Sequence, residues 1–272
     1  MHFKELSYAN DDDPLFKKLV IRTVENLSGR NRYVEVYKKW RTEVVGKSDH
    51  VFTDMLGLID IGLSVKGNWP PKDLPDTPIV MVANHPYGIA DGIAVYDAIL
   101  RRRPDAIFFA NADALRVNPR FAEALIPVEW VEAKRTREKT RLTLQGARDA
   151  FERERCVVMF PAGRLARRNA QGRLIDPPWA PTAVSLAQKY AAPIVPVHVA
   201  GPDSVWFHLF NRFSQELRDI TLFHELLNKA GKRFDLTVGP LIDPQTAGLE
   251  TGRLKAYVEL QLPETPDKVF HA

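Results

Sequence analysis

A histidine and an aspartate lie close together directly after a short apolar run, residues 79–83 (IVMVA). Five residues separate His85 from Asp91, and Pro86 and Gly88 between them allow the chain to curl. A carboxylate that keeps one imidazole nitrogen protonated leaves the other nitrogen free to act as a general base. The alternative is that His85 is a structural residue at a strand end and Asp91 only caps a helix. We favour the first interpretation, in which both residues are catalytic.

A second loop whose residues could bind a ligand follows the apolar run 156–160 (CVVMF). It contains a turn from Pro161 to Gly163, followed by Arg164 and Arg168. Such a turn exposes backbone amides, and arginine can grip phosphate or carboxylate oxygens through two hydrogen bonds. The alternative is a surface turn with solvated arginines. The loop lacks the Gly-Lys-Ser/Thr ending of a Walker A motif, and the chain has no Gly-x-Ser-x-Gly nucleophile elbow.

Strand and helix patterns alternate along most of the chain, and they must position these two loops. Apolar runs predict strands at 79–83, 106–110, 156–160, 193–199 and 234–239, and other patterns predict helices at 91–103, near 119–125, at 138–153, at 181–190 and within 205–232. This order predicts an α/β fold with a mostly parallel central sheet flanked by helices. Loops that leave the C-terminal ends of strands are where ligands usually bind in such sheets.

The N-terminal part of the chain has a different pattern. Residues 15–45 predict two short amphipathic helices, and the Pro-rich stretch 69–78 marks a boundary. We therefore expect an N-terminal helical segment over residues 1–68, which associates with a membrane, and an α/β domain over residues 69–272.

One face of the second N-terminal helix is aromatic. Tyr33, Tyr37 and Trp40 share this face with Val36, and lysines and an arginine lie beside it. This pattern is typical of a helix at a membrane interface, and the alternative is that the face packs on the main domain. The apolar segment 51–65 is too short and too charged to span a membrane, so it predicts a core helix or part of a surface for acyl chains.

Composition places the protein in a reducing compartment. The 272 residues include one cysteine, Cys156, which excludes an intramolecular disulfide and a multi-cysteine metal site. We expect Cys156 to be inert core, and His198, His208 and His224 to be structural. No signal peptide or membrane-spanning run is apparent. The formal charge of +4 is concentrated in basic clusters at 101–103, 134–141 and 164–173, which favour anionic partners.

The two loops together resemble the glycerolipid acyltransferase superfamily, which includes the 1-acylglycerol-3-phosphate acyltransferases. The resemblance covers roughly residues 78–242, and four blocks occur in the family's order, at 84–91, 134–137, 160–163 and 193–197. Two departures are specific to this chain. The usual family motif has four residues between His and Asp, and the five found here are similar to a hemolysin-like, lyso-ornithine-lipid branch. Ala162 and Arg164 also replace a common Glu and Thr, so the acceptor need not be lysophosphatidic acid.

The resemblance implies an acyltransferase without a covalent intermediate. His85, oriented by Asp91, takes the proton of a lysolipid hydroxyl that attacks the thioester of acyl-CoA or acyl-carrier protein. The acceptor is of the lysophosphatidic acid or lyso-ornithine-lipid type. Further residues are expected to bind substrate or form its oxyanion site, namely Asn84, Gly88, Lys134, Arg135, Pro161, Gly163, Arg164 and Arg168.

The resemblance also sets expectations about partners and place. We expect no metal, no cofactor besides the thioester donor, and no nucleic acid partner. We expect a cytoplasmic protein that contacts the anionic inner face of the cell membrane peripherally. Two alternatives stay open, namely a metal-dependent hydrolase with His85 and Asp91 as ligands, and a non-catalytic lipid-binding protein.

Overall fold

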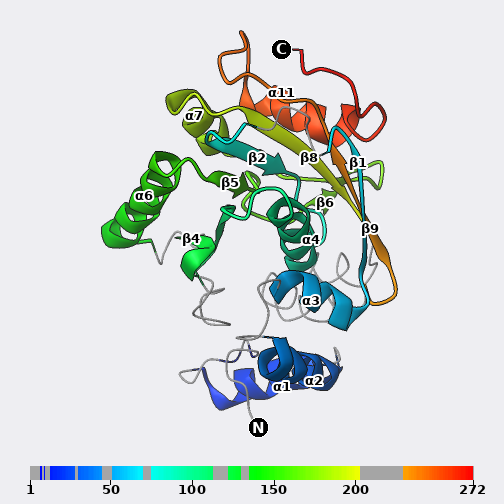
Figure 1. Cartoon of the computed structure of the whole chain (residues 1–272). Coiled ribbons are helices and arrows are strands. Elements are labelled where there is room, and N and C mark those ends of the chain that lie inside the picture. The colour runs from blue at the N-terminus through cyan, green and yellow to red at the C-terminus, as the bar shows by residue number, and fades with distance from the viewer. Residues whose placement is uncertain are drawn as a thin grey trace. The chain divides into compact units, whose positions relative to one another are not determined.

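A computed structural model of the chain contains a seven-stranded sheet (Figure 1). The structure describes residues 7, 9, 13–27, 30–44, 51–69, 75–112, 122–129, 135–202 and 229–271. The strand order is β1-β9-β8-β2-β5-β3-β4. The strands are β1 (Gly62–Gly67), β2 (Ile79–Ala83), β3 (Ile107–Asn111), β4 (Leu125–Val128), β5 (Cys156–Met159), β8 (Ile194–Ala200) and β9 (Arg233–Val238).

Most of the described strand pairs are parallel. β2 lies between β5 and β8 and pairs in parallel with both, and β3 pairs in parallel with β4 and β5. β8 and β9 are antiparallel. All five residues of β2 are buried, as expected for a central strand covered on both faces. The prediction of an α/β fold with a mostly parallel sheet is confirmed.

Helices lie between the strands in the chain. They are α1 (Leu15–Leu27), α2 (Arg30–Lys39), η2 (Trp40–Val44, a π-helical turn), α3 (Val51–Ile59), α4 (Ile89–Leu100), α6 (Arg137–Glu152), α7 (Thr182–Lys189), α11 (Thr251–Ala256) and η5 (Tyr257–Gln261, also π-helical). One core cluster joins sheet residues to α6, α7, α11 and η5, and it includes Val80, Val82, Val157, Met159, Ala150, Phe151, Ala183, Ala187, Leu254 and Val258. This cluster holds the strands in place.

The chain forms two compact units, each described by itself. The larger unit comprises residues 65–86, 98–200 and 235–272, and it contains most of the sheet. The smaller unit comprises residues 1–64, 87–97 and 201–234. No helix in the described ranges is both long and apolar enough to cross a membrane.

Most expected elements are present, with differences at the two ends of the chain. The predicted strands and the helices at 138–153 and 181–190 agree with the structure within about two residues. β1 lies before the boundary expected at residue 68, so a strand of the sheet begins within the segment expected to be helical. The helical turns over 251–261 were not predicted. Most of the helix expected within 205–232 falls outside the described residues.

Candidate active site

His85 follows the C-terminal end of β2, and its backbone is held from both sides. The His85 N–H donates to the carboxylate of Asp176, at 3.1 Å from Oδ1 and 3.2 Å from Oδ2. The His85 carbonyl accepts from the Ala166 N–H at 3.0 Å. The imidazole lies beside the ring of Phe160, with centroids 4.6 Å apart. His85 itself is half-buried, so the fold fixes its backbone while leaving part of the side chain accessible.

Asn84 fastens the end of β2 to the neighbouring strand β8. Its side-chain Nδ2 donates to the Val199 carbonyl at 3.1 Å, and its Oδ1 accepts from the Val199 N–H at 2.6 Å. This pair of bonds extends the sheet pairing one residue beyond β2, and Asn84 is buried. The geometry gives Asn84 a clear part in fixing the start of the His85 loop. Its expected contact with substrate stays a prediction.

Asp91 organises the turn that precedes it. Its Oδ2 accepts the N–H of Tyr87 at 2.7 Å and of Gly88 at 3.1 Å, and its side chain is buried. Gly88 has a φ of +85°, a left-handed conformation that side chains disfavour. The Tyr87 ring meets Phe234 edge-on with centroids 5.6 Å apart. Asp91 and Gly88 therefore give this turn one defined shape.

The position of Asp91 differs from the expected helix cap. α4 begins at Ile89, so Asp91 lies inside its first turn, and its carboxylate accepts amides that precede the helix. A carboxylate at this place also interacts favourably with the positive end of the helix dipole. His85 belongs to the larger unit and Asp91 to the smaller one. The expected contact between their side chains, and their catalytic roles, stay predictions.

Asp176 is a site residue that the sequence reasoning missed. It is 4% exposed and accepts the indole N–H of Trp179 at 2.8 Å in addition to the His85 N–H. Its own N–H donates to Glu259 Oε1 at 2.6 Å, and Glu259 pairs with Lys255. Burial raises the pKa of the Asp176 carboxyl to about 6, although the bond from Trp179 lowers it. No short motif marks Asp176, because two of its three partners, His85 and Glu259, are distant in sequence.

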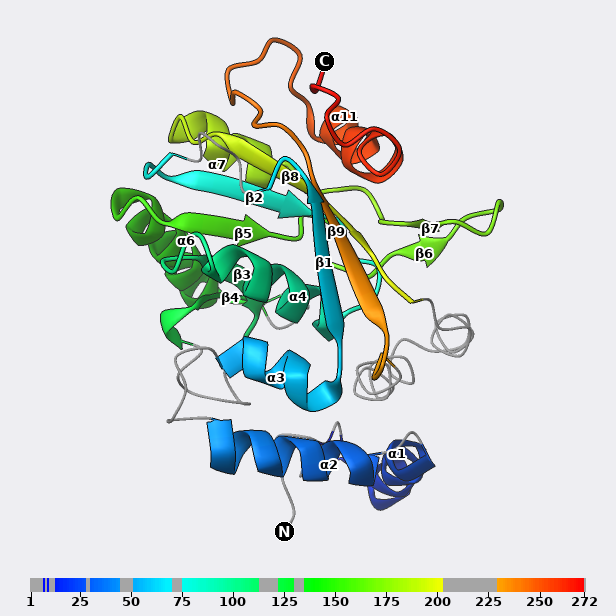
Figure 2. The same cartoon turned by 45° about the vertical axis from the view of Figure 1, so that its right-hand side comes forward.

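The second predicted loop leaves β5 and leads into a small hairpin, β6 (Arg167–Arg168) and β7 (Leu174–Ile175), seen in Figure 2. The Gly163 N–H closes the turn onto the Phe160 carbonyl at 3.0 Å, and Gly163 has a φ of +61°. The buried Pro161 accepts the Ala180 N–H through its carbonyl at 2.9 Å. The structure thus confirms a tight turn after β5.

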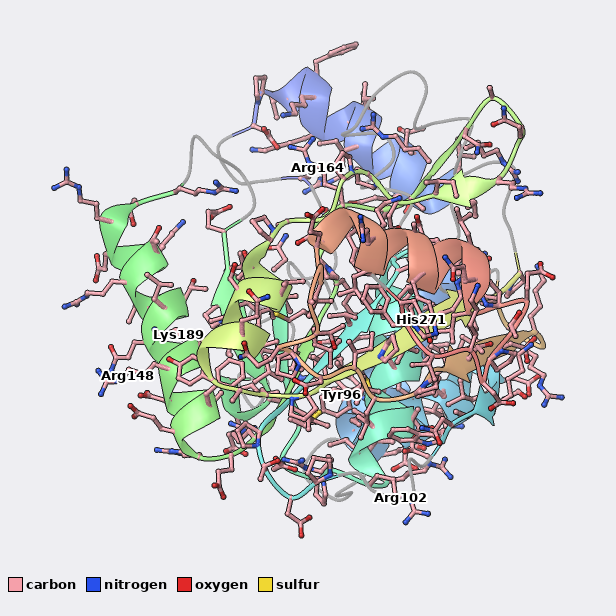
Figure 3. All side chains as sticks on the ribbon, turned by 90° about the horizontal axis from the view of Figure 1, so that it is seen from above. Tyr96, Arg102, Arg148, Arg164, Lys189 and His271 are labelled. Carbon is pink, nitrogen blue, oxygen red and sulfur yellow. The ribbon has the colours of Figure 1, made fainter. Side chains whose placement is uncertain are left out.

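The arginines of this loop are exposed. Arg164 lies on the loop before β6 (Figure 3), and its side chain is solvent-accessible. Arg168 is also exposed and donates to the Gly172 carbonyl at 2.5 Å within the hairpin. An exposed guanidinium can still reach an anionic ligand. The binding roles expected for Arg164, Arg168, Pro161 and Gly163 stay predictions.

The basic block near residue 135 borders a shallow, open hollow at the start of α6. Arg135 is exposed and donates through Nε to the Glu129 carbonyl at 3.0 Å. Thr136 caps the helix by accepting the Lys139 N–H at 3.2 Å. Lys134, the other residue expected here, lies outside the described residues. The hollow is lined by Arg135, Thr136, Arg137, Thr140, Arg141 and Leu144, so an anion there would meet several positive charges.

Two further residues have the core environment that was expected. Cys156 is fully buried, and burial raises its pKa. A thiol with a raised pKa is a poor nucleophile. The His198 Nδ1 lies 3.0 Å from the Val258 carbonyl, and burial lowers the pKa of His198 to about 4, which keeps the ring neutral. His208 and His224 lie outside the described residues.

Two residues of the aromatic face expected to meet a membrane are buried. Tyr37 is 1% exposed and Trp40 is 3% exposed, and their ring centroids lie 5.7 Å apart. Neither of these two side chains is therefore presented to a membrane, and packing of the face on the main domain stays a prediction. Large apolar side chains are instead exposed on α1, namely Leu15, Phe16, Leu19 and Leu27, with Val20 partly exposed.

Comparison with known proteins gives a consistent result. A family described as acyltransferase matches residues 71–261. A lyso-glycine lipid O-acyltransferase of Phocaeicola vulgatus is 26% identical over 195 residues, covering 69% of this chain and 67% of that protein. One from Bacteroides thetaiotaomicron is 26% identical over 196 residues, covering 69% and 68%. The crystal structure of the 1-acyl-sn-glycerophosphate acyltransferase PlsC from Thermotoga maritima is similar, with a TM-score of 0.50, 15% identity, and coverage of 87% and 80%. This last likeness concerns the fold alone.

Proposed function

Because this chain belongs to the acyltransferase family that matches its residues 71–261, we propose that it is a lipid O-acyltransferase acting on the hydroxyl of a lysolipid. The observation that carries the proposal is the position of His85. It follows the central strand β2 at its C-terminal end, in a loop whose backbone is fixed by Asp176 and Ala166. That is where a parallel sheet presents its catalytic groups.

In the proposed reaction, His85 acts as a general base. It takes the proton of the acceptor hydroxyl while that oxygen bonds to the thioester carbonyl carbon. The carbon–sulfur bond then breaks, and the leaving thiolate receives the proton from the imidazolium, so that an ester and a free thiol result. Asp91 orients the base. The amides of Tyr87 and Gly88 already donate to Asp91, so the candidates to stabilise the oxyanion are other backbone amides at the start of α4. The reaction needs no cofactor besides the thioester.

The substrates follow from the relatives and from charge. Two relatives are named lyso-glycine lipid O-acyltransferases, so we propose an acceptor of the lyso-aminolipid type, with glycine or ornithine headgroups ahead of lysophosphatidic acid. The donor is acyl-CoA or acyl-carrier protein. Both are anionic, and the basic hollow around Arg135 and Arg141 supports the binding of an anionic group by electrostatics.

A matrix of donors and acceptors tests this function. Purified protein is incubated with acyl-CoA or acyl-carrier protein and with lyso-glycine lipid, lyso-ornithine lipid or lysophosphatidic acid, and products are identified by mass spectrometry. We expect an acylated aminolipid and one equivalent of free thiol. Thioester cleavage without an acylated product would contradict acyl transfer and favour a hydrolase. Acylation of lysophosphatidic acid alone would contradict the acceptor class.

We also propose peripheral contact with the anionic cytoplasmic face of the membrane, through α1. Leu15 is 85% exposed and Phe16 is 78% exposed, and Leu19 lies one turn after Leu15 on the same helix face. An apolar helix face flanked by lysine and arginine is suited to an anionic lipid surface. The support is the exposure of these side chains together with a lipid substrate.

Flotation with liposomes that contain anionic lipid tests this contact. The double variant Leu15→Ser/Leu19→Ser is expected to float less than the wild type, because it removes apolar area from the lipid contact. Leu142→Ser serves as a matched control, since Leu142 is also an exposed leucine on a helix, α6. Equal flotation of the wild type and the α1 variant would contradict the contact.

A further inference from the structure

The structure assigns a positioning role to Asp176, and this inference rests on the proposed function. We infer that Asp176 fixes the backbone of His85 and supplies a negative charge that stabilises the imidazolium formed when His85 takes the acceptor's proton. Asp176 acts through His85 and needs no contact with substrate.

The first support is the hydrogen bonding of the carboxylate. Both Asp176 oxygens accept the His85 N–H, at 3.1 and 3.2 Å, and Oδ2 also accepts the Trp179 indole N–H at 2.8 Å. Two donors from separate parts of the chain therefore converge on one buried side chain. Hydrogen bonds to a charged acceptor are stronger than those between neutral groups. The carboxylate thus holds the His85 backbone more firmly than a neutral acceptor would.

The second support is that Asp176 itself is anchored. Its N–H donates to Glu259 Oε1 at 2.6 Å, and Lys255 pairs with Glu259 one helical turn earlier. Glu259 is largely buried in η5, which forms part of the core cluster through Val258. The core cluster therefore fixes Glu259, and Glu259 fixes Asp176. Asp176 in turn fixes the backbone of His85 through the His85 N–H. Groups that orient a functional imidazole are typically supported in this way.

The third support is that the ionised carboxylate of Asp176 is unfavourable in its buried environment. The pKa of Asp176 is raised to about 6, mainly by burial and also by the charge of Glu259, against the opposite effects of Trp179, the His85 N–H and the charge of His85. Among the residues that the structure describes, Glu259 and His85 are the charged groups that act on Asp176, and Lys255 pairs with Glu259. A buried charge with no direct cation partner is costly. The cost is offset at the moment when His85 becomes positively charged.

The consequence for the reaction follows from the same charges. Above about pH 6 the Asp176 carboxyl is ionised, so it attracts an imidazolium at His85 and favours proton uptake. Removing the charge should slow the transfer, because the imidazolium formed at His85 would lose this attraction.

Steady-state kinetics of the full chain with Asp176→Asn tests the inference. The amide preserves size and one acceptor oxygen and removes the charge. We expect kcat for acyl transfer to fall by roughly 10- to 100-fold, the range for groups that orient an imidazole, with the KM for the thioester nearly unchanged. Asp243→Asn is the matched control, because Asp243 is an exposed carboxylate that accepts the Gln245 N–H at 2.8 Å, and it should leave both quantities unchanged.

A second variant, Trp179→Phe, tests the same inference if Asp176→Asn does not fold. Trp179→Phe removes one hydrogen bond to the carboxylate and leaves its charge in place, which raises the pKa of Asp176. We expect wild-type turnover at pH 8 and about two-fold lower turnover at pH 6, because less of the carboxyl is ionised there. A constant ratio of Trp179→Phe to wild-type turnover across this range would overturn the inference.

For Asp176→Asn, an unchanged kcat in the folded variant, or a loss of kcat/KM that lies entirely in KM, would also overturn the inference. Wild-type protein that acylates no acceptor would instead defeat the proposed function, so the two failures are distinguishable.

Discussion

Two aspartates lie at opposite ends of the parallel strands, Asp176 buried and Asp105 partly exposed, and each accepts a backbone N–H at the end of a strand. Their electrostatic surroundings are opposite. Asp105 accepts the N–H of Cys156, where β5 begins, at 2.9 Å, and Asp176 accepts the N–H of His85, just after β2 ends. Asp105 also binds Arg103 through two hydrogen bonds, of 2.8 and 2.7 Å. Asp176 has Trp179 as its other donor and lies near the negative Glu259. The contact is the same, but only Asp105 has a direct cationic partner.

The pKa values separate the two carboxyls. Burial would raise the pKa of Asp105, but the bonds from Arg103 and Cys156 outweigh it and hold the pKa below its usual value. Burial prevails at Asp176 and raises its pKa to about 6. A charge that is compensated in the resting protein supports structure. A charge whose natural partner forms only during a reaction is suited to function. The comparison shows that the carboxylate beside Cys156 has its charge compensated by a cation, whereas the carboxylate beside His85 does not, which supports the proposed role of the His85 end.

The largest expected effect is at His85. Replacing His85 by Ala should lower kcat by roughly 10²–10⁴-fold, the usual contribution of a general base, with little change in thermal stability because the imidazole is half-buried. His271→Ala is the matched control, since His271 is an exposed histidine (Figure 3). Turnover and the unfolding temperature are measured on each. Wild-type turnover by His85→Ala would refute the general-base assignment.

At the end of the sheet where β5 begins, Arg103 should contribute to the free energy of unfolding. Its guanidinium also donates to the carbonyls of Pro75, Thr77 and Glu154, at 2.7 to 3.0 Å. Arg103→Ala should lower the free energy of unfolding by about 3 kcal/mol, the lower end of the range for a broken buried pair, because Asp105 is 37% exposed. Urea unfolding measures this loss, and activity per folded molecule should be unchanged. A folded variant with impaired turnover would break the distinction between the two ends.

The pH dependence of stability should have opposite signs for the two aspartates. The folded-state pKa of Asp176 is raised from 3.8 to about 6, so its contribution is fully present below 3.8 and is lost as pH rises through 6. That loss is on the order of 3 kcal/mol. The pKa of Asp105 is lowered, so its contribution is present above 3.8 and is lost as pH falls.

Urea unfolding of the wild type, Asp176→Asn and Asp105→Asn from about pH 2 to about pH 7.5 measures both slopes as differences from the wild type, because the Asp105 slope lies below 3.8. Slopes of the same sign would contradict the comparison.

The smallest effect is expected at Glu259. Glu259→Gln keeps an oxygen that can accept the Asp176 N–H but removes a negative charge that raises the pKa of Asp176. The pKa of Asp176 should therefore fall, and the loss of stability on raising the pH should be complete at a lower pH. The same urea series measures this shift. An unmoved midpoint would show that burial alone sets the pKa of Asp176.

Local patterns were enough to predict much of the fold and the residues of the His85 loop. The run 79–83 is β2 because a continuous apolar segment can be buried on both faces only in a central strand. The turn after β5 was also marked by its own residues, Pro161 and Gly163. β1 was missed, because Gly62–Gly67 carries little apolar pattern and lies at the edge of the sheet order. The position of Asp91 was wrong by a fraction of a turn, since α4 starts at Ile89.

The sequence by itself determined the α/β class, the loop that carries His85, and the acyltransferase resemblance. These depend on neighbouring residues, whose spacing is legible without a structure. Only the tertiary structure decided which face of the N-terminal helices is buried, and that Asp176 holds His85. Asp176 is 91 residues from His85 and 83 from Glu259, and contacts over such distances arise from how the strands and η5 pack together. No local pattern encodes them.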